Sequence, residues 1–334
     1  MKYVTIIDIA RELGISKSTV SRALRGDAQN VGKETMRLIQ QTAERMGYKR
    51  NEMAVNLRQQ RTRTIGIVVP EMTTTFFPTF IIYAQETLNK AGYRVVVAQS
   101  HEDTMAERQN LAMMEDYRVD GILMSICHGT KNLDCYRHLI EKGIPIVFFD
   151  RTLQGIGASC VRIDDYIKAF FMVEHMIRKG RTHIVHLAGP DYIPNAQDRK
   201  QGYRDALRKF SLNLPSDYII NAGLDFTDGE HAIEEFIKKE IPFDAIFGFT
   251  EMSVLGAKNC LQNHHYRIPE DVSVACISGT ELCKLVHPSI TTVEQPVEKM
   301  AERASELLIR MIESSSPLIE CVTLDAEMKE REST

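Results

Sequence analysis

Several features are missing from this 334-residue chain, and each absence removes a class of protein. No apolar run approaches the roughly 20 residues of a membrane-spanning helix, which argues against an integral membrane protein. The N-terminus is polar and starts a helical pattern, so we expect no signal peptide and a cytoplasmic location. A periplasmic-type sugar-binding protein is therefore a remote alternative.

Metal and catalytic motifs are also missing. The cysteines number seven, are scattered and lack metal-type spacing, which is typical of reduced thiols. We find no Gly-rich phosphate loop, nucleophile elbow or His-Glu metal motif, and the ten histidines, His264 and His265 included, are dispersed. We expect no metal, no cofactor and no catalysis; an enzyme on an α/β core is the alternative. The cysteines are Cys127, Cys135, Cys160, Cys260, Cys276, Cys283 and Cys321.

Residues 5–22 fit two short helices joined by a glycine turn. Thr5 has an acidic residue three positions on, which is a capping-box start. Gly14 suits the left-handed conformation that ends a helix, and Ser16 suits the cap of the next one. This pattern predicts a helix-turn-helix, although ordinary helical bundles also use it.

The second of these helices presents short polar and cationic side chains that suit major-groove base edges: Lys17, Ser18, Ser21 and Arg22. Residues 1–63 hold 13 Lys and Arg against 6 Asp and Glu, whereas the remainder holds 28 against 39. A basic N-terminal region on an otherwise acidic chain is what contact with DNA phosphates requires. We therefore predict DNA binding.

A third helix is predicted near residues 33–46, and a hinge follows it. The hinge stretch 51–58 is too short for a stable isolated helix. It would order on DNA with Leu57 as a minor-groove wedge, or serve as an ordinary linker.

From Arg63 onward short β-branched runs alternate with helical stretches such as 84–91. This spacing predicts βαβ units, and the pattern occurs twice. The predicted fold is an α/β core of two doubly wound parallel-sheet halves behind an all-α headpiece. Ligands bind at the carboxyl ends of parallel strands, so we expect a cleft between the halves.

The order of these parts, together with several short motifs, resembles the lactose-repressor (LacI/GalR) family of bacterial transcription regulators. The resemblance implies a homodimer that binds a pseudo-palindromic operator and whose DNA binding is switched by a small effector. It also implies a core with a fold like that of periplasmic sugar-binding proteins. The C-terminus lacks a leucine-heptad extension, so we expect a dimer and not a tetramer. The motifs include 63–67, 119–122, 143–147, 149–151, 268–274 and 331–334.

The resemblance also implies domain boundaries. They are a headpiece at 1–48, a hinge at 49–63 and an effector and dimerisation core at 64–334, with an N-terminal half at about 64–163 plus 295–320 and a C-terminal half at about 164–294 plus 321–334.

Carried over by resemblance, Lys17, Ser18 and Arg22 would contact bases, and Leu57 would be the wedge. Thr5, Ser16, Thr19, Ser21 and Asn30 would lie near phosphates. Three positions depart from the family pattern: Gly32 replaces a frequent serine, Arg50 a common proline and Val55 a hinge arginine.

The effector residues implied in the same way are Thr74, Phe76, Phe77, Asp150, Asp164, Asn195, Arg199, Glu251 and Ser278. Glu251 stands where aspartate is common, and Ser278 replaces an acid. The two phenylalanines could instead be core residues, and Arg199 could form a surface ion pair.

An arginine, carboxylates and aromatic rings suit a hydroxyl-rich ring, so a sugar is the first prediction for the effector. A nucleobase is second, although Ile193 and Asn195 stand where we would expect an additional cation. A sugar phosphate or another metabolite stays open. We expect the ligand to rotate one half against the other, and the sequence does not fix whether it releases or recruits DNA.

Overall fold

The computed structural model describes residues 4–24, 26, 29–48, 61–127, 129, 133–153, 155–314 and 318–334. The chain divides into two compact units, Met1–Gln60 and Arg61–Thr334, called here the headpiece and the core. In the described residues no helix has both the length and the apolar character needed to cross a bilayer.

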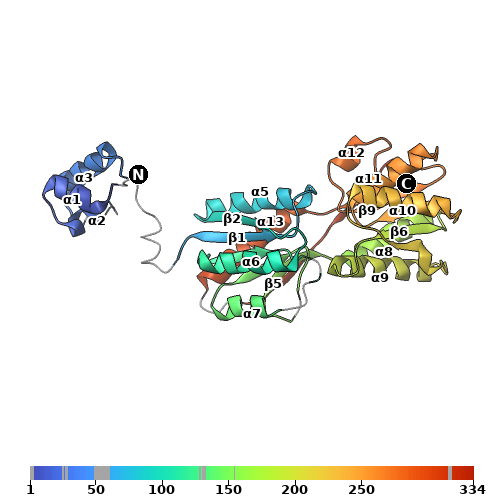
Figure 1. The fold of residues 1–334 in the computed structure, drawn as a ribbon, viewed down its shortest axis with the longest axis horizontal. Coiled ribbons are helices and arrows are strands. Elements are labelled where there is room, and N and C mark those ends of the chain that lie inside the picture. Colours follow the sequence, from blue (N-terminus) through green and yellow to red (C-terminus); the bar gives the residue numbers. More distant parts are fainter. Residues whose placement is uncertain are drawn as a thin grey trace. The chain divides into compact units, whose positions relative to one another are not determined.

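In its described residues the headpiece has three helices, drawn in blue in Figure 1, which pack around a small apolar cluster. Ile9, Val20 and Ile39 come one from each helix and are fully buried against one another. The third helix lies where the sequence predicted it. The helices are α1 (Ile6–Leu13), α2 (Lys17–Ala23) and α3 (Lys33–Arg45).

The first half of the core is a six-stranded parallel sheet with the order β11-β5-β4-β3-β1-β2. Its strands are β1 (Thr64–Val69), β2 (Arg94–Gln99), β3 (Gly121–Met124), β4 (Ile146–Phe149), β5 (Ser159–Ile163) and β11 (Cys321–Leu324). Its helices are α5 (Phe76–Lys90), α6 (Thr104–Asp116), α7 (Asp134–Glu141) and α13 (Val297–Glu313).

The second half has the order β12-β10-β9-β8-β6-β7, and only β12 pairs antiparallel. Its strands are β6 (Ile184–Ala188), β7 (Ile219–Asn221), β8 (Ala245–Gly248), β9 (Ser273–Ile277), β10 (Thr291–Glu294) and β12 (Glu327–Lys329). Its helices are α8 (Asp165–Arg178), α9 (Pro194–Lys209), α10 (Phe226–Lys238), α11 (Glu251–Asn263) and α12 (Leu282–Leu285), with a 3-10 turn at Ser216–Tyr218.

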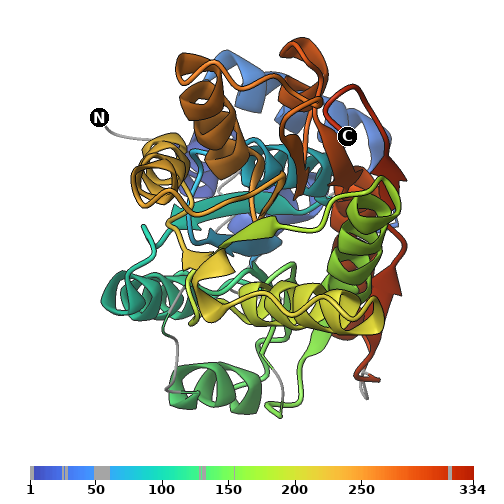
Figure 2. The same cartoon turned by 90° about the vertical axis from the view of Figure 1, so that its right-hand side faces the viewer.

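Helices cover both faces of the second sheet (Figure 2). Phe247 and Ala275 point to the face under α8 and α9, while their neighbours Ile246 and Val274 point to the face under α10 and α11. Because both faces are buried, these strands consist almost entirely of apolar residues and lack polar alternation. The two doubly wound halves confirm the predicted fold class.

The chain passes between the halves three times: after β5, after β10 and after β11. Residues 321–334 were predicted to belong as a whole to the C-terminal half. Cys321–Leu324 instead pair with β5 in the first sheet, and only the residues after them return to the second. The strand is short and lies far from its partner in sequence, so its pairing leaves no local signal.

The cysteines depart from the expectation of reduced thiols. Cys160 and Cys321 are opposite one another on β5 and β11, with their Cα atoms 4.4 Å apart, and they form a disulfide. A sequence separation of 161 residues hides this pair from any reading of local spacing. The other five cysteines are not in disulfides.

Candidate functional site

The helix-turn-helix is built by local capping. The Thr5 hydroxyl accepts from the Asp8 N–H while the Asp8 carboxylate accepts from the Thr5 N–H, which is the predicted capping box. Gly14 ends α1 with φ at 62°, and the Ser16 hydroxyl caps α2 by accepting from the Thr19 N–H at 3.1 Å. These caps fix the angle between the two helices because they specify where each begins and ends.

The second helix has one buried side and one exposed side. Val20 and Ala23 are fully buried, whereas Lys17, Ser18 and Arg22 are exposed. Thr19 and Ser21 are half-buried, and Thr5, Ser16 and Asn30 are exposed. The predicted wedge Leu57 lies outside the described residues.

A cavity of about 410 Å³, called here the cleft, lies where the carboxyl ends of strands from both sheets meet. Of the nine effector residues predicted from sequence, eight line it: Thr74, Phe76, Phe77, Asp150, Asn195, Arg199, Glu251 and Ser278.

The ninth, Asp164, is not at the cleft. Its carboxylate caps α8 by accepting from the Ile167 N–H at 3.0 Å. The next residue, Asp165, is the one that bonds to the cleft arginine: Nε and Nη2 of Arg199 approach its Oδ1 at 2.7 and 2.6 Å. An N-cap side chain folds back on its own helix, so the acid that reaches Arg199 is displaced by one position.

Arg199 is held from several sides. Besides Asp165, its Nη1 donates to the Phe249 carbonyl at 2.6 Å and its Nη2 to the Ser278 hydroxyl at 3.4 Å. The guanidinium also lies over the Phe249 ring, 4.4 Å from the centroid. Arg199 and Asp165 are 2% and 5% exposed, so the pair is buried and is not the surface ion pair of the alternative interpretation.

Burial dominates the electrostatics of this pair. It raises the pKa of Asp165 to about 6, although the Arg199 charge pulls that pKa down. Burial likewise raises the pKa of Asp150, against the lowering effect of Arg151 and Arg199. Both carboxyls therefore sit where the charged form is costly.

Hydrogen bonds connect the two halves across the cleft. Asn195 Nδ2 donates to Asp150 Oδ1 at 3.3 Å, and the Thr75 hydroxyl donates to Glu251 Oε1 at 3.4 Å. Glu251 is also held within its own half, where it accepts from the N–H and hydroxyl of Thr280 at 2.7 and 2.8 Å. Both cross-cleft bonds are longer than a typical hydrogen bond, so each is a weak connection between the halves.

Phe76 and Phe77 line the cleft and also belong to the core. Their exposed fractions are 8% and 3%, and their rings meet edge to face with centroids 5.0 Å apart. They open α5, which begins eight residues before the predicted helix start at Ala84. Pro78 lies in the first turn, where proline is tolerated, so it does not stop the helix.

Sequence reasoning missed other cleft residues. They share a position just after a strand: Glu71 after β1, His101 after β2, Arg151 after β4, Phe249 after β8 and Gln295 after β10. The rule that ligands bind at the carboxyl ends of parallel strands could have found them.

The cleft lining is acidic. Among the described residues, Arg151 and Arg199 face an excess of carboxylates. Each arginine already pairs with an acid, Arg151 with Glu102 at 2.7 Å and Arg199 with Asp165. The lining therefore favours an uncharged or cationic guest over an anion. Its carboxylates are Glu71, Glu102, Asp150, Asp225 and Glu251.

Comparison with known proteins finds a matching family model in each of the two units. Residues 5–51 match the model of bacterial regulatory proteins of the lacI family, and residues 173–334 match a periplasmic binding protein-like domain. The chain is 31% identical to the HTH-type transcriptional regulator RegA of Clostridium acetobutylicum, over 98% of each chain. It is 27% identical to GalR of Escherichia coli, over 93% of this chain and 90% of GalR.

Solved structures share the fold. The lac repressor dimer bound to operator and the anti-inducer ONPF has a TM-score of 0.88 at 19% identity, over 99% of each chain. A complex of the transcriptional regulator CelR with cellobiose has a TM-score of 0.76 at 24% identity, over 99% of this chain and 100% of CelR. The chain belongs to the lacI family of DNA-binding transcription regulators, with a periplasmic-binding-protein-like effector domain, and is not an enzyme.

Proposed function

We propose that this regulator binds a palindromic operator as a homodimer and that a neutral sugar in the cleft changes its affinity for DNA. The observation that carries the proposal is the cleft itself, whose walls come from both halves. Long hydrogen bonds, from Asn195 to Asp150 and from Thr75 to Glu251, connect the walls. A guest that contacts both walls binds one relative position of the halves better than another, and such differential affinity is what shifts a conformational equilibrium.

The lining favours a sugar over a sugar phosphate. Carboxylate and amide groups such as Asp150 and Asn195 accept from and donate to hydroxyls, and the rings of Phe76 and Phe77 can cover an apolar C–H face. A phosphate would face five carboxylates in a site whose arginines are already paired. The CelR complex holds cellobiose in a protein of this fold. A nucleobase is the second candidate.

On the DNA side, Lys17, Ser18 and Arg22 are proposed to contact bases, because they share the exposed side of α2. A guanidinium can donate two hydrogen bonds to guanine, so Arg22 would carry the strongest preference. Thr5, Ser16, Thr19, Ser21 and Asn30 would approach phosphates, and Leu57 would enter the minor groove.

Exposed apolar side chains support the homodimer. Ile82 on α5 is 57% exposed and Val97 on the neighbouring edge strand β2 is 37% exposed. Leu285 on α12 is 78% exposed. Apolar groups on an uncovered sheet edge and on the helix beside it suit an interface between copies of the chain. We expect Ile82→Glu to lower the dimer fraction in sedimentation experiments.

A thermal-shift panel of sugars, sugar phosphates and nucleobases tests the effector. A ligand at 100 times its Kd stabilises the fold by about 2.7 kcal/mol. We expect a neutral sugar to raise the Tm and to change operator affinity about 5- to 150-fold. A shift with a nucleobase alone would select the second candidate, and no shift from any compound would contradict the proposal.

A matched pair of variants locates the site. Asp150→Asn removes a cleft carboxylate that faces Asn195, so the sugar-induced shift should fall sharply. Asp164→Asn is the control, because Asp164 lies outside the cleft and asparagine caps a helix as well as aspartate does. Equal loss in both variants would argue against the assignment of the cleft.

Arg22→Ala tests base contact. We expect it to cost about 1–3 kcal/mol in operator binding while leaving most of the salt-dependent binding to random DNA. Fluorescence anisotropy on a selected operator and on a scrambled duplex measures both. Equal losses on the two duplexes would show that Arg22 contacts phosphate only.

A further inference from the structure

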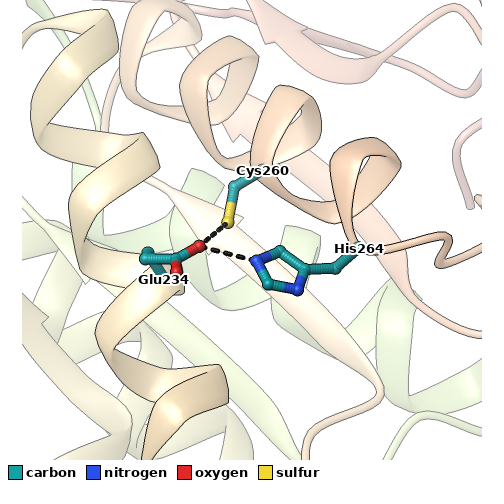
Figure 3. Close-up of side chains that lie close together, drawn as sticks. All are labelled: Glu234, Cys260 and His264. Atoms are coloured by element: carbon teal, nitrogen blue, oxygen red, sulfur yellow. Dashed lines mark hydrogen bonds and ion pairs between the residues drawn. The ribbon is translucent and has the colours of Figure 1, made fainter.

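A second group of chemically reactive side chains lies away from the cleft, where α10 and α11 meet. Glu234 comes from α10, Cys260 from α11, and His264 from the residue that caps the end of α11. None of the three lines the cleft. Figure 3 shows the thiol and the imidazole both pointing at one carboxylate.

The three ligand atoms converge on a small volume. His264 Nε2 lies 2.6 Å and Cys260 Sγ 3.5 Å from the same oxygen, Oε2 of Glu234. All three lie within 4.8 Å of one another. Zinc–ligand bonds of about 2.0–2.3 Å in a tetrahedron place ligand atoms roughly 3.3–3.5 Å apart. The Sγ–Oε2 distance already matches this spacing, whereas a bound ion requires the imidazole to move outward from Oε2.

The fold produces this convergence through close helix packing. Cys260 and His264 are four residues apart, so they lie on the same side of the end of α11. Glycines bring α10 against that side: a Cβ at Gly229 would lie 1.8 Å from the Ser253 carbonyl oxygen, and one at Gly256 would lie 1.8 Å from the Phe226 carbonyl oxygen. Larger residues at either position would push the helices apart and separate Glu234 from its partners.

Burial and charge suit a bound cation. Cys260 is 2% exposed and shielded from solvent, while the side chains of His264 and Glu234 are 38% and 33% exposed and leave a route for an ion. Lys238 opposes a cation, but its Nζ lies 3.6 Å from Oε1 of Glu234, the oxygen that faces away from the other two ligands.

We propose that Glu234, Cys260 and His264 bind a divalent zinc-type ion, with water as the fourth ligand. Sulfur, imidazole and carboxylate together are a donor set that zinc accepts in tetrahedral geometry. On binding, the Cys260 thiol releases its proton to solvent, and the neutral His264 imidazole offers its Nε2 lone pair while its one proton sits on Nδ1. The sequence predicted no metal, because ligands from two helices leave no compact motif in the chain.

Cobalt(II) is the first probe, because a tetrahedral cobalt–thiolate centre gives visible and charge-transfer absorption bands. The full chain is stripped with chelator and titrated with Co²⁺, then Zn²⁺ is added in competition. We expect saturation at one equivalent per chain, loss of the charge-transfer band in Cys260→Ser, and displacement of Co²⁺ by Zn²⁺.

His264→Asn and His265→Asn form the matched pair. His265 is the exposed neighbour of His264 and is not in the cluster. We expect His264→Asn to weaken binding at least about tenfold, since even outer partners of metal ligands change affinity by 10- to 100-fold, and His265→Asn to leave it unchanged. Glu234→Gln should weaken it as well.

Two results would overturn the proposal: absence of tetrahedral cobalt bands in the unmodified chain, or bands that persist unchanged in both His264→Asn and Glu234→Gln. If Cys260→Ser fails to fold, the two partly exposed ligands still decide the question. Circular dichroism of each variant verifies the fold.

Discussion

The headpiece and the core differ in where their functional side chains lie. In the headpiece, the residues proposed to contact bases are on the outside of α2, while Val20 and Ala23 hold the same helix to its neighbours. In the core, some of the cleft residues are themselves part of the interior: Arg199 is 2% exposed and Glu251 is 3% exposed.

In the headpiece, the residues proposed to recognise DNA are therefore different from those that stabilise the fold. In the core, the same residues line the cleft and stabilise the fold. A change on the exposed side of α2, such as Arg22→Ala, should leave the free energy of unfolding within about 0.5 kcal/mol. A change at Arg199 removes a cleft contact and a buried ion pair at once. The effect of a cleft variant on ligand binding therefore has to be interpreted together with its measured free energy of unfolding.

Arg199→Ala should have the largest effect on stability. It leaves Asp165 buried without its partner, and breaking a buried ion pair by removing one member costs about 3–5 kcal/mol. Urea unfolding followed by circular dichroism measures the loss. Replacing both residues, as in Arg199→Met with Asp165→Leu, should recover most of it because no charge stays buried. A loss below 1 kcal/mol in the single variant would mean that the cleft residues, like those on the headpiece surface, contribute little to the stability of the fold.

The pH dependence of Asp165 is the next effect in size. Its pKa is raised from 3.8 to about 6 in the fold, so its contribution to stability is fully present below pH 3.8 and is lost as the pH rises through 6. This rise in the pKa corresponds to about 3 kcal/mol. Asp165→Asn cannot titrate. The stability of the wild type relative to this variant should therefore fall as the pH rises from 4.5 to 7.

Urea unfolding of both chains across that pH range is the measurement. The comparison subtracts the titration of all other groups, His186 included, whose burial lowers its pKa to about 3 and acts in the opposite direction. A difference that stays constant or grows with pH would contradict the raised pKa.

Local features were predictable from sequence, and contacts between distant segments were not. The cap at Ser16 and the left-handed Gly14 depend on neighbours within a few residues, so these helix ends were predicted correctly. The alternation of strands and helices gave the fold class of the core in the same way. The disulfide of Cys160 with Cys321 and the bonds from Thr280 to Glu251 join segments whose proximity only the folded sheets create.

Asp164 and Asp165 show that this limit on prediction from sequence applies even to neighbouring residues. The sequence placed an effector acid at Asp164, but the start of α8 turns that carboxylate back onto its own helix, and Asp165 reaches Arg199 instead. Glu251 shows the same limit in another form: its position was predicted, but its bonds to Thr280, which occupy much of the carboxylate, were not.

Two helix caps give the smallest effects and test whether the headpiece depends on local capping alone. Ser16 caps α2 with its hydroxyl, whereas Gly32 begins α3 with no side-chain cap. Ser16→Ala should destabilise the headpiece by about 1 kcal/mol. Gly32→Ser should stabilise it by only a few tenths of a kcal/mol, because glycine is already a tolerable cap and a Cβ there meets nothing within 4 Å. Thermal unfolding of the headpiece signal measures both, and the core transition is the internal reference. A shift in the core transition, or a loss with Gly32→Ser, would show that the stability of the headpiece does not follow from its own caps.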